Sequence, residues 1–214
     1  ARTFSAAGYD VVGLARSDRS AAHLARLVGE GGGAYAHLIC DVTQPAEVAD
    51  VLRPHADRIA VLVHNAAALL IKPFDEITAD EFERVWRVAC YGAFVASRIV
   101  VPHMAARKAG AIILTGATAA LRGGPKFAAF ASAKFALRGL AQSLSREFGP
   151  QGVHVAHVVL DGLIDEPQTD ARFGPAKSAR MDPDAIAHAY LAVATQHRSA
   201  WTHELDLRPS SERF

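Results

Sequence analysis

The alternation of short apolar runs with helical stretches constrains the fold of this chain more than any other feature. Residues 59–63 (IAVLV) are apolar at every position, which predicts a strand buried on both faces of its sheet. Five further runs bounded by turn residues also have the composition of strands. The six predicted strands cover residues 9–15, 34–40, 59–63, 111–115, 153–160 and 201–207.

Segments with helical periodicity separate these strands. Thr78 and Glu81 have the spacing of a capping box, which predicts the start of a long helix that ends at Gly110. A second long helix is expected from Ala129 to Phe148, where Gly149-Pro150 terminates it. Further helices are expected at residues 1–7, around 24–28, at 48–52 and at 184–195. The alternation predicts one α/β domain over residues 1–214, a Rossmann-like, doubly wound parallel sheet in a three-layer α/β/α arrangement.

The charge balance and the apolar content exclude several classes of partner. Half of the 214 residues are apolar, and 23 Lys and Arg residues face 22 Asp and Glu residues. Because attraction to phosphate requires a basic excess, we expect neither nucleic acid nor an acidic membrane as partner. No run approaches the roughly 20 apolar residues of a membrane span, and the first residues lack the layout of a signal peptide.

The number of cysteines indicates a reducing compartment, and the spacing of the histidines argues against a metal site. Cys40 and Cys90 are too few for a disulfide framework, so we expect a cytoplasmic protein. His154 and His157 lie on one predicted strand at an odd separation, which places their rings on opposite faces. We therefore expect no metal site.

Candidate site residues follow the predicted strands, because ligands of such sheets bind beyond the carboxyl ends of the strands. A cation at Arg16 can pair with a ribose 2'-phosphate, or it can be a solvated arginine in a turn. Asp41 can contact a ligand or cap the next helix. The other candidates lie in His64-Asn65-Ala66-Ala67 and in the segment from Gly110 to Pro150.

These strand-end segments resemble the short-chain dehydrogenase/reductase family over nearly the whole chain. Arg16-Ser17 is similar to members with an arginine at this place, which implies NADP(H) in preference to NAD(H). The resemblance also implies that Asp41 and Val42 contact adenine. Asn65, Ala66 and Ala67 match the family's N-N-A-G motif in part, with His64 in place of its first Asn and Ala67 in place of Gly. Small residues there let the backbone approach the adenosine.

The segment around Lys134 resembles the family's catalytic segment, yet three catalytic positions differ. Lys134 matches the lysine of the Y-x-x-x-K pair, and Phe130 stands in place of the tyrosine. Ala117 stands in place of the catalytic serine, and Ala89, in V-A-C-Y-G, in place of the asparagine. The resemblance implies hydride transfer to or from a small substrate, with a retained lysine that holds the nicotinamide ribose. For Lys134 the alternative is a surface lysine on a helix.

Other residues have to supply the missing polar groups if the site is active. Thr118 and Asp161 are candidate proton donors, with Thr115 and Tyr91 as further candidates. Asp161-Gly162 occupies the place of the family's Pro-Gly beside the nicotinamide, although Asp161 can also simply cap the next segment. General acid–base catalysis is worth roughly 10²–10⁴ in rate, so ordinary alcohol–ketone interconversion should be very slow.

The resemblance further predicts a strand and a glycine-rich phosphate loop that would precede Ala1, so we expect an incomplete amino-terminal part. The helices through Trp86 and Lys134 are similar to the family's dimer helices, which predicts a homodimer or homotetramer. Three functions remain open: an NADP(H)-linked oxidoreductase with an atypical site, a catalytically silent nucleotide-binding or partner subunit, and a scaffold that binds no nucleotide.

Overall fold

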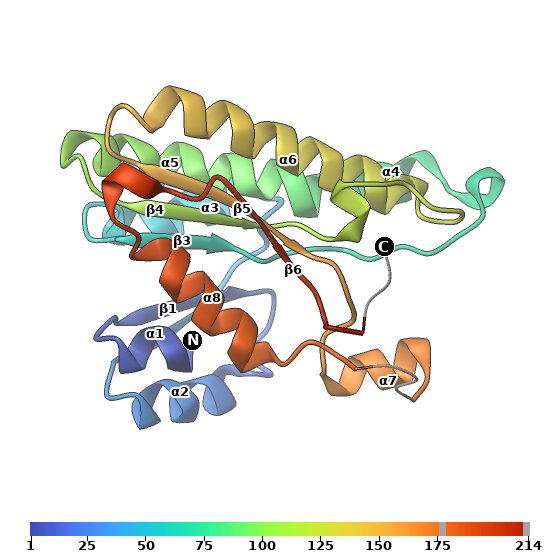
Figure 1. Cartoon of the computed structure of the whole chain (residues 1–214), viewed down its shortest axis with the longest axis horizontal. Helices are drawn as coiled ribbons and strands as arrows, with labels where there is room; N and C mark the ends of the chain where they lie inside the picture. The colour runs from blue at the N-terminus through green and yellow to red at the C-terminus, as the bar shows by residue number, and fades with distance from the viewer. Residues whose placement is uncertain (176–178, 212–214) are drawn as a thin grey trace.

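The chain alternates strands and helices in the predicted order (Figure 1). The structure is a computed structural model that describes residues 1–175 and 179–211. Its strands are β1 (Val11–Ala15), β2 (Tyr35–Ile39), β3 (Val61–His64), β4 (Ala111–Thr115), β5 (His154–Leu160) and β6 (Glu204–Leu207). Its α-helices are α1 (Arg2–Ala6), α2 (Ala21–Glu30), α3 (Pro45–Leu52), α4 (Ala79–Trp86), α5 (Gly92–Ala106), α6 (Ala128–Phe148), α7 (Pro167–Phe173) and α8 (Pro183–Ala194). Short helical turns are η1 (Arg53–His55), η2 (Phe74–Glu76), the π-helical η3 (Arg87–Tyr91), η4 (Thr118–Ala120) and η5 (Arg198–Ala200).

All strand pairs are parallel, which confirms the predicted fold class, but the strands form two sheets. β3, β4, β5 and β6 make one sheet in that order, and β1 pairs only with β2. We expected one sheet. No strand within the described residues joins β1 to β3, and the ladder stops there because its hydrogen bonds require strands about 4.8 Å apart.

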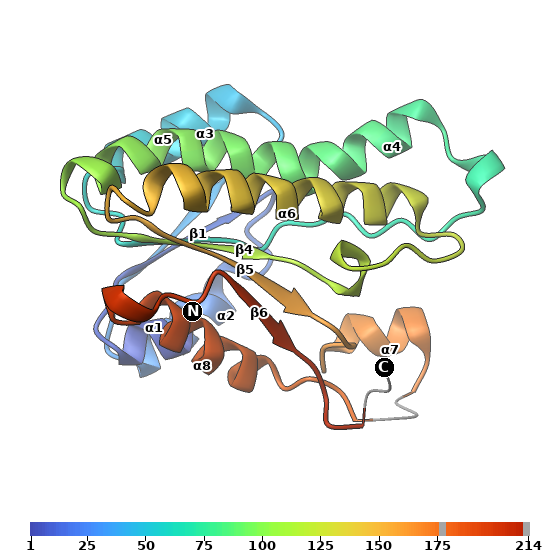
Figure 2. The same cartoon turned by 45° about the horizontal axis from the view of Figure 1, so that its top comes forward.

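Helices cover both faces of the four-stranded sheet. Figures 1 and 2 show α4, α5 and α6 along one face and α8 along the other, with α1 and α2 beside β1. Alternate residues of β4 belong to different cores: Ile112 and Leu114 pack in the cluster that includes Leu137 of α6, and Ile113 packs in the cluster that includes Tyr190 of α8. This two-sided burial is the arrangement that the apolar strand patterns predict.

Several boundaries differ from the prediction because side chains near the strand ends have other partners. β1 begins at Val11, because Tyr9 donates its backbone N–H to Phe4 and packs on that ring at 5.6 Å. β6 begins at Glu204, because Trp201 stacks on His154 at 4.8 Å and donates its indole N–H to a loop carbonyl. Between β5 and α8 the chain also forms the short helix α7, for which no helix is predicted above.

The capping box is confirmed, whereas the helix that follows it is not continuous α-helix. Thr78 Oγ1 accepts the N–H of Glu81 at 3.2 Å, and the Glu81 carboxylate accepts the N–H of Thr78 at 2.9 Å. Residues 87–91 then form the π-helical turn η3 between α4 and α5, and α5 ends at Ala106. Single π-helical turns within helices are frequent at functional sites.

One helical stretch is long and apolar enough to cross a membrane, contrary to the expectation from the sequence. Residues 79–106 meet the criteria of length and composition, and 56 % of their most apolar window is buried inside the molecule. Core helices pass the same test, and Val100 and Met104 of this stretch are fully buried against the sheet.

Candidate active site

Lys134 lies buried on α6 at the carboxyl end of β4. Lys134 is 3 % exposed, and its Nζ donates a hydrogen bond of 2.7 Å to the backbone carbonyl of Thr115. Burial lowers the pKa of Lys134 to about 8. The surface position that was the alternative for this lysine is therefore wrong, because the helix directs it into the sheet edge.

Phe130 and Ala89 lie next to this lysine. The Phe130 ring, about one helical turn before Lys134, has its centroid 5.7 Å from Nζ. Phe130 packs against the buried cluster that contains Val85, Ala89 and Ala133. The structure thus brings Phe130 and Ala89 into one apolar cluster, and Phe130 also contacts Lys134.

His64, at the end of β3, connects this cluster to the π-helical turn. Its Nε2 donates to the carbonyl of Val88 across 3.2 Å, and its side chain is 5 % exposed. Burial lowers the pKa of His64 to about 4; the hydrogen bond to Val88 opposes the shift, and the Lys134 charge adds to it. His64 is therefore a neutral ring that fixes one carbonyl of η3.

A second polar cluster lies beyond the ends of β4 and β5. Thr118 Oγ1, in η4 next to Ala117, donates to Asp161 Oδ1 at 2.5 Å, and Asp161 is 1 % exposed. Arg208 Nη1 lies 3.4 Å from Oδ2, and Arg122 Nη2 lies 3.7 Å from Oδ1. Both candidate donors therefore meet, and two guanidinium groups lie beside their carboxylate.

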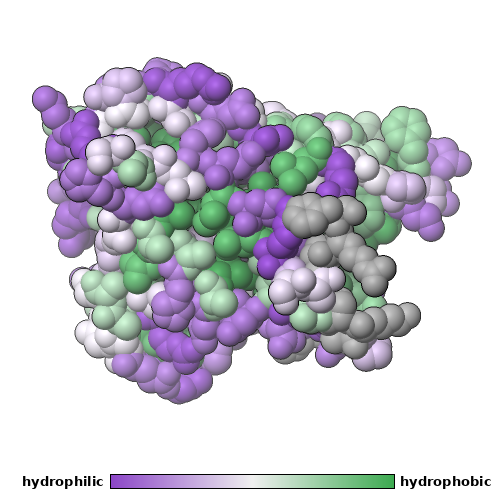
Figure 3. All heavy atoms as spheres, viewed as in Figure 1, coloured by the Kyte–Doolittle hydropathy of each residue, from purple (hydrophilic) through white to green (hydrophobic). Residues whose placement is uncertain are grey.

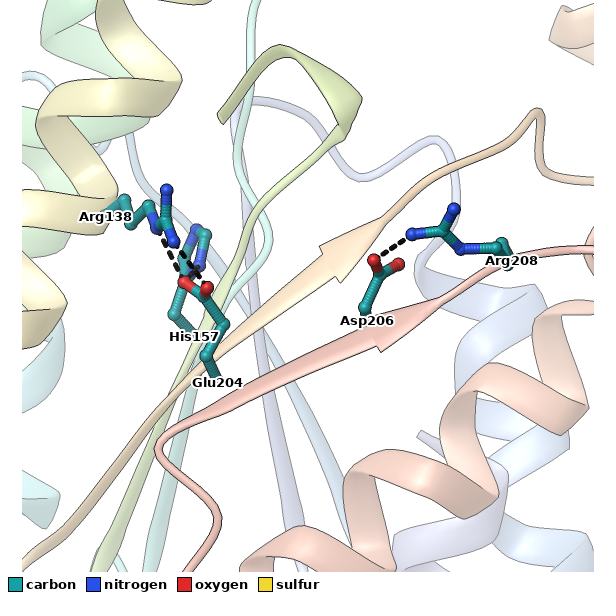
Figure 4. Close-up of polar contacts among 5 residues, drawn as sticks. All are labelled: Arg138, His157, Glu204, Asp206 and Arg208. Carbon is teal, nitrogen blue, oxygen red and sulfur yellow. Dashed lines mark hydrogen bonds and ion pairs between the residues drawn. The ribbon is translucent and has the colours of Figure 1, made fainter. Parts of the chain in front are cut away.

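A third cluster joins α6 to β5 and β6 (Figure 4). The Arg138 guanidinium binds the Glu204 carboxylate with two hydrogen bonds of 2.7 and 2.6 Å, and His157 Nδ1 donates to Glu204 across 3.1 Å. Two residues further along β6, Asp206 pairs with Arg208. These partners were not predicted, because sequence spacing does not reveal which side chains of α6 and β6 face each other.

His157 is buried and neutral. Burial lowers its pKa; the hydrogen bond and charge of Glu204 oppose this, and the charges of Arg138 and Lys134 add to it. Its Nε2 has no hydrogen-bond partner among the described residues and points toward Gly116, where an added Cβ would lie 2.5 Å away. The glycine after β4 thus gives space to this ring. His154 instead bonds through Nε2 to Thr202, so the two histidines have separate partners.

The candidate adenosine residues lie at the ends of β1, β2 and β3. Arg16 and Ser17 are exposed, and Asp41 Oδ1 accepts hydrogen bonds from the N–H and hydroxyl of Thr43 at 2.9 and 2.8 Å. Burial alone would raise the pKa of Asp41, but the Thr43 hydrogen bonds and the charges of Arg16 and Arg87 lower it overall. Asp41 is thus an ionised carboxylate near Arg16.

The remaining predicted cofactor residues are small and lie at the same edge. Asn65 and Ala67 are exposed after β3, and Ala66 is half-buried. Val42 packs where a Cβ of Gly92 would lie, and Gly162 is crowded by Pro209, whose Cδ lies 2.6 Å from the position of an added Cβ.

The fit to a dinucleotide is partial. Arg16 follows β1, residues 65–67 follow β3, and Lys134 of α6 bonds the last residue of β4, so all three places lie at carboxyl ends of parallel strands, where such folds bind ligands. Within the described ranges no strand is followed by a glycine-rich loop that opens a helix, which is the usual cradle of a pyrophosphate. The same ranges contain no group of three or more side chains arranged to hold a metal ion.

A parallel α/β fold with polar side chains at its strand ends is typical of nucleotide-binding proteins, and the comparisons specify the family. A sequence model described as short chain dehydrogenase matches residues 1–172. A short-chain dehydrogenase from Rhodopseudomonas palustris is 36 % identical, with a TM-score of 0.83 over 98 % of this chain and 91 % of that chain. The chain belongs to the short-chain dehydrogenase family.

Other relatives differ in their named activities. A 3-alpha-(or 20-beta)-hydroxysteroid dehydrogenase of Mycobacterium bovis is 34 % identical over 64 % of this chain and 52 % of its own length. A 3-oxoacyl-(acyl-carrier-protein) reductase of Salmonella typhimurium is 30 % identical over 80 % of this chain and 70 % of its own length. A metagenomic short-chain oxidoreductase in complex with NADP is 26 % identical, with a TM-score of 0.83 over 99 % of this chain and 90 % of that chain. The chain spans about half the length of the first curated relatives that it matches.

Proposed function

We propose that this chain is part of an NAD(P)-dependent oxidoreductase with an atypical active site, which transfers hydride to or from a small-molecule substrate. The observation that carries the proposal is Lys134, a buried lysine bonded to the Thr115 carbonyl at the carboxyl edge of the sheet. Burying a lysine without a paired carboxylate costs free energy, and buried ionisable groups of this kind cluster at functional sites. The nicotinamide, when bound, supplies or accepts the hydride.

The predicted cofactor residues have distinct roles in this proposal. Arg16 and Ser17 would hold the 2'-phosphate, which favours NADP(H) over NAD(H). Asp41 and Val42 would contact adenine, and Asn65, Ala66 and Ala67 would face the adenosine. Lys134 would hold the nicotinamide ribose, with Asp161 and Gly162 beside the nicotinamide ring. The exposure of Arg16 and its influence on the Asp41 carboxylate support a binding position for the phosphate.

The substituted positions restrict the chemistry. Phe130 has no proton to give, and Ala117 and Ala89 have no polar side chain for a developing alkoxide or an ordered water. We therefore propose slow turnover of simple alcohols and ketones. A substrate whose carbonyl is already polarised needs less help from these positions.

A second candidate function is a catalytically silent nucleotide-binding or partner subunit. The apolar cluster formed by Phe130, Ala89, Val85 and Ala133 favours it, because this cluster fills the catalytic position with carbon. Titration calorimetry with NADP(H) and NAD(H), followed by nicotinamide absorbance across a panel of small carbonyl compounds, separates the two functions. Binding with turnover supports the oxidoreductase, binding without turnover supports the silent protein, and no binding contradicts both.

We further propose that the protein forms a homodimer or homotetramer through α5 and α6 and is cytoplasmic. Phe94 of α5 and Phe135 of α6 are 43 % and 44 % exposed, although they lie on the two longest helices. Figure 3 shows that apolar residues also gather across the middle of one face, between polar regions. Sedimentation of the Phe94→Glu and Phe135→Glu variants tests the interface, and an unchanged assembly would contradict it.

A further inference from the structure

The atypical site leaves open which group exchanges a proton with the substrate oxygen. Thr118 and Asp161 are the candidates that the sequence indicates, but their hydrogen bond runs from the Thr118 hydroxyl to the Asp161 carboxylate at 2.5 Å. A hydroxyl has one proton, so this one is already donated. The guanidinium groups at 3.4 and 3.7 Å pair with the same carboxylate, and Asp161 therefore acts as an acceptor.

Lys134 has N–H donors that form no hydrogen bond with the described residues. An ammonium group has three N–H donors, and only one of them is used in the 2.7 Å bond to the Thr115 carbonyl. No ion pair joins Lys134 to a carboxylate anywhere in residues 1–175 or 179–211. Its Nζ lies instead over the Phe130 ring, at 5.7 Å from the centroid. The Phe130 ring is itself half-buried, whereas Lys134 is 3 % exposed.

We propose that the Lys134 ammonium, and not the Thr118 hydroxyl, exchanges the proton with the substrate oxygen in this site. This inference rests on the proposed oxidoreductase function. In the reductive direction the carbonyl carbon gains the hydride of the reduced nicotinamide, and the C=O π pair moves to oxygen. That oxygen takes one N–H proton of Lys134, whose N–H pair remains as the lone pair of a neutral amine. Water later returns the proton, and oxidation is the reverse.

The groups that face Lys134 suit this exchange, because none of them neutralises it. His64 on β3 and His157 on β5 are buried, and burial lowers the pKa of each ring, so both are neutral. Glu204 on β6 is bound by Arg138 and His157. Val85 of α4 and Ala89 of η3 pack in the apolar cluster that includes Phe130 and Ala133, the residue before Lys134. Burial also lowers the pKa of Lys134 to about 8, close to the value that an efficient acid–base catalyst needs.

The first test measures the pKa of Lys134 directly, without cofactor or substrate. The protein is labelled with ¹³C at lysine Cε, and the Lys134 signal is assigned as the one that the Lys134→Met variant lacks. We expect this signal to titrate near pH 8, well below the ordinary lysine value of 10.5. A Lys134 midpoint at the ordinary value would overturn the proposal.

The second test follows turnover against pH in wild type, Lys134→Arg and the matched control Lys108→Arg. Arginine keeps the cation but does not release a proton at these pH values. Lys134→Arg should therefore lose about 10²-fold or more in kcat while it still binds NADP(H) in calorimetry. The control should keep the wild-type profile, because Lys108 is exposed at the opposite end of β4.

A further variant, Thr118→Val, distinguishes proton transfer through Lys134 from proton transfer through Thr118 and Asp161. If Thr118→Val abolishes the pH dependence of kcat and Lys134→Arg preserves it, the proton passes through Thr118 and Asp161, and the proposal is wrong. Absence of NADP(H) binding in wild type is a different result, because it contradicts the proposed function while the titration of Lys134 still reports on the lysine itself.

Discussion

Lys134 and Asp161 are both charged side chains buried at the carboxyl edge of the same sheet, but their surroundings differ in kind. Asp161 has a hydroxyl donor at 2.5 Å and two guanidinium groups within 4 Å. Lys134 has one backbone carbonyl, two neutral histidines and an apolar ring. A paired buried charge holds a fold together, whereas an unpaired buried charge is available for chemistry and lowers stability.

The largest expected effect comes from removing the paired charge. Asp161→Ala would leave Arg208 without the carboxylate that it faces at 3.4 Å, and breaking a buried pair costs about 3–5 kcal/mol. We expect a loss of that size in the free energy of unfolding measured with urea. The control Asp165→Ala removes a carboxylate whose side chain is 72 % exposed and should change little. Equal losses in both variants would show that Asp161 is not specially paired.

The second prediction restores the missing polar groups next to the unpaired lysine. Ala117→Ser with Phe130→Tyr adds a donor for the developing alkoxide and a hydroxyl beside Lys134. Because one such donor is worth roughly 10²–10³ in kcat, turnover of simple ketones should rise by about this factor. Phe135→Tyr, on the exposed side of α6, is the matched control. Loss of turnover specifically in Phe130→Tyr would contradict the assigned position of the catalytic site.

The third prediction concerns stability against pH. The pKa of Lys134 is about 8 in the folded protein, whereas an ordinary lysine, as in the unfolded chain, has a pKa of 10.5, so folding releases a proton between these values. The unfolded state binds more protons there, and wild-type stability should therefore rise with pH relative to Lys134→Met. At pH 7 the variant should be more stable by up to about 3 kcal/mol, since one pKa unit corresponds to about 1.36 kcal/mol.

The measurement is urea unfolding of both proteins at several pH values from 7 to about 10. We expect the advantage of Lys134→Met to shrink as the pH increases. A constant difference, or one that grows with pH, would indicate that the folded protein does not lower the pKa of Lys134.

The smallest effect is expected at Arg16, which follows β1 and is exposed to solvent. Arg16→Ala should weaken NADP⁺ binding roughly tenfold and leave NAD⁺ binding unchanged, because only NADP⁺ carries the 2'-phosphate. Calorimetry with both nucleotides measures this, with Arg19→Ala from the same exposed turn as control. Equal weakening for both nucleotides would contradict the assignment of the phosphate to Arg16.

Features that depend on neighbours along the chain could be predicted from the sequence. The capping box of Thr78 and Glu81 is local, and the residue types at the strand ends indicate the fold class and the family. The π-helical turn at residues 87–91 could not be predicted, because one of its carbonyls, that of Val88, is bound by His64 of β3, 24 positions away in the sequence. Thr118 and Asp161 are 43 positions apart. The sequence indicates each as a candidate proton donor but does not indicate that they form a hydrogen bond with each other.

The sequence by itself determined that the chain alternates strands and helices, and that the candidate site positions hold one lysine, Lys134, and three side chains without a polar group, Phe130, Ala117 and Ala89. Tertiary structure decided which charges are paired. Arg138, His157 and Glu204 come from α6, β5 and β6, and only the packing of that helix on that sheet brings them together (Figure 4). The physical reason is that residue identity determines which ionisable groups exist, whereas burial and partners determine the pKa values of these groups.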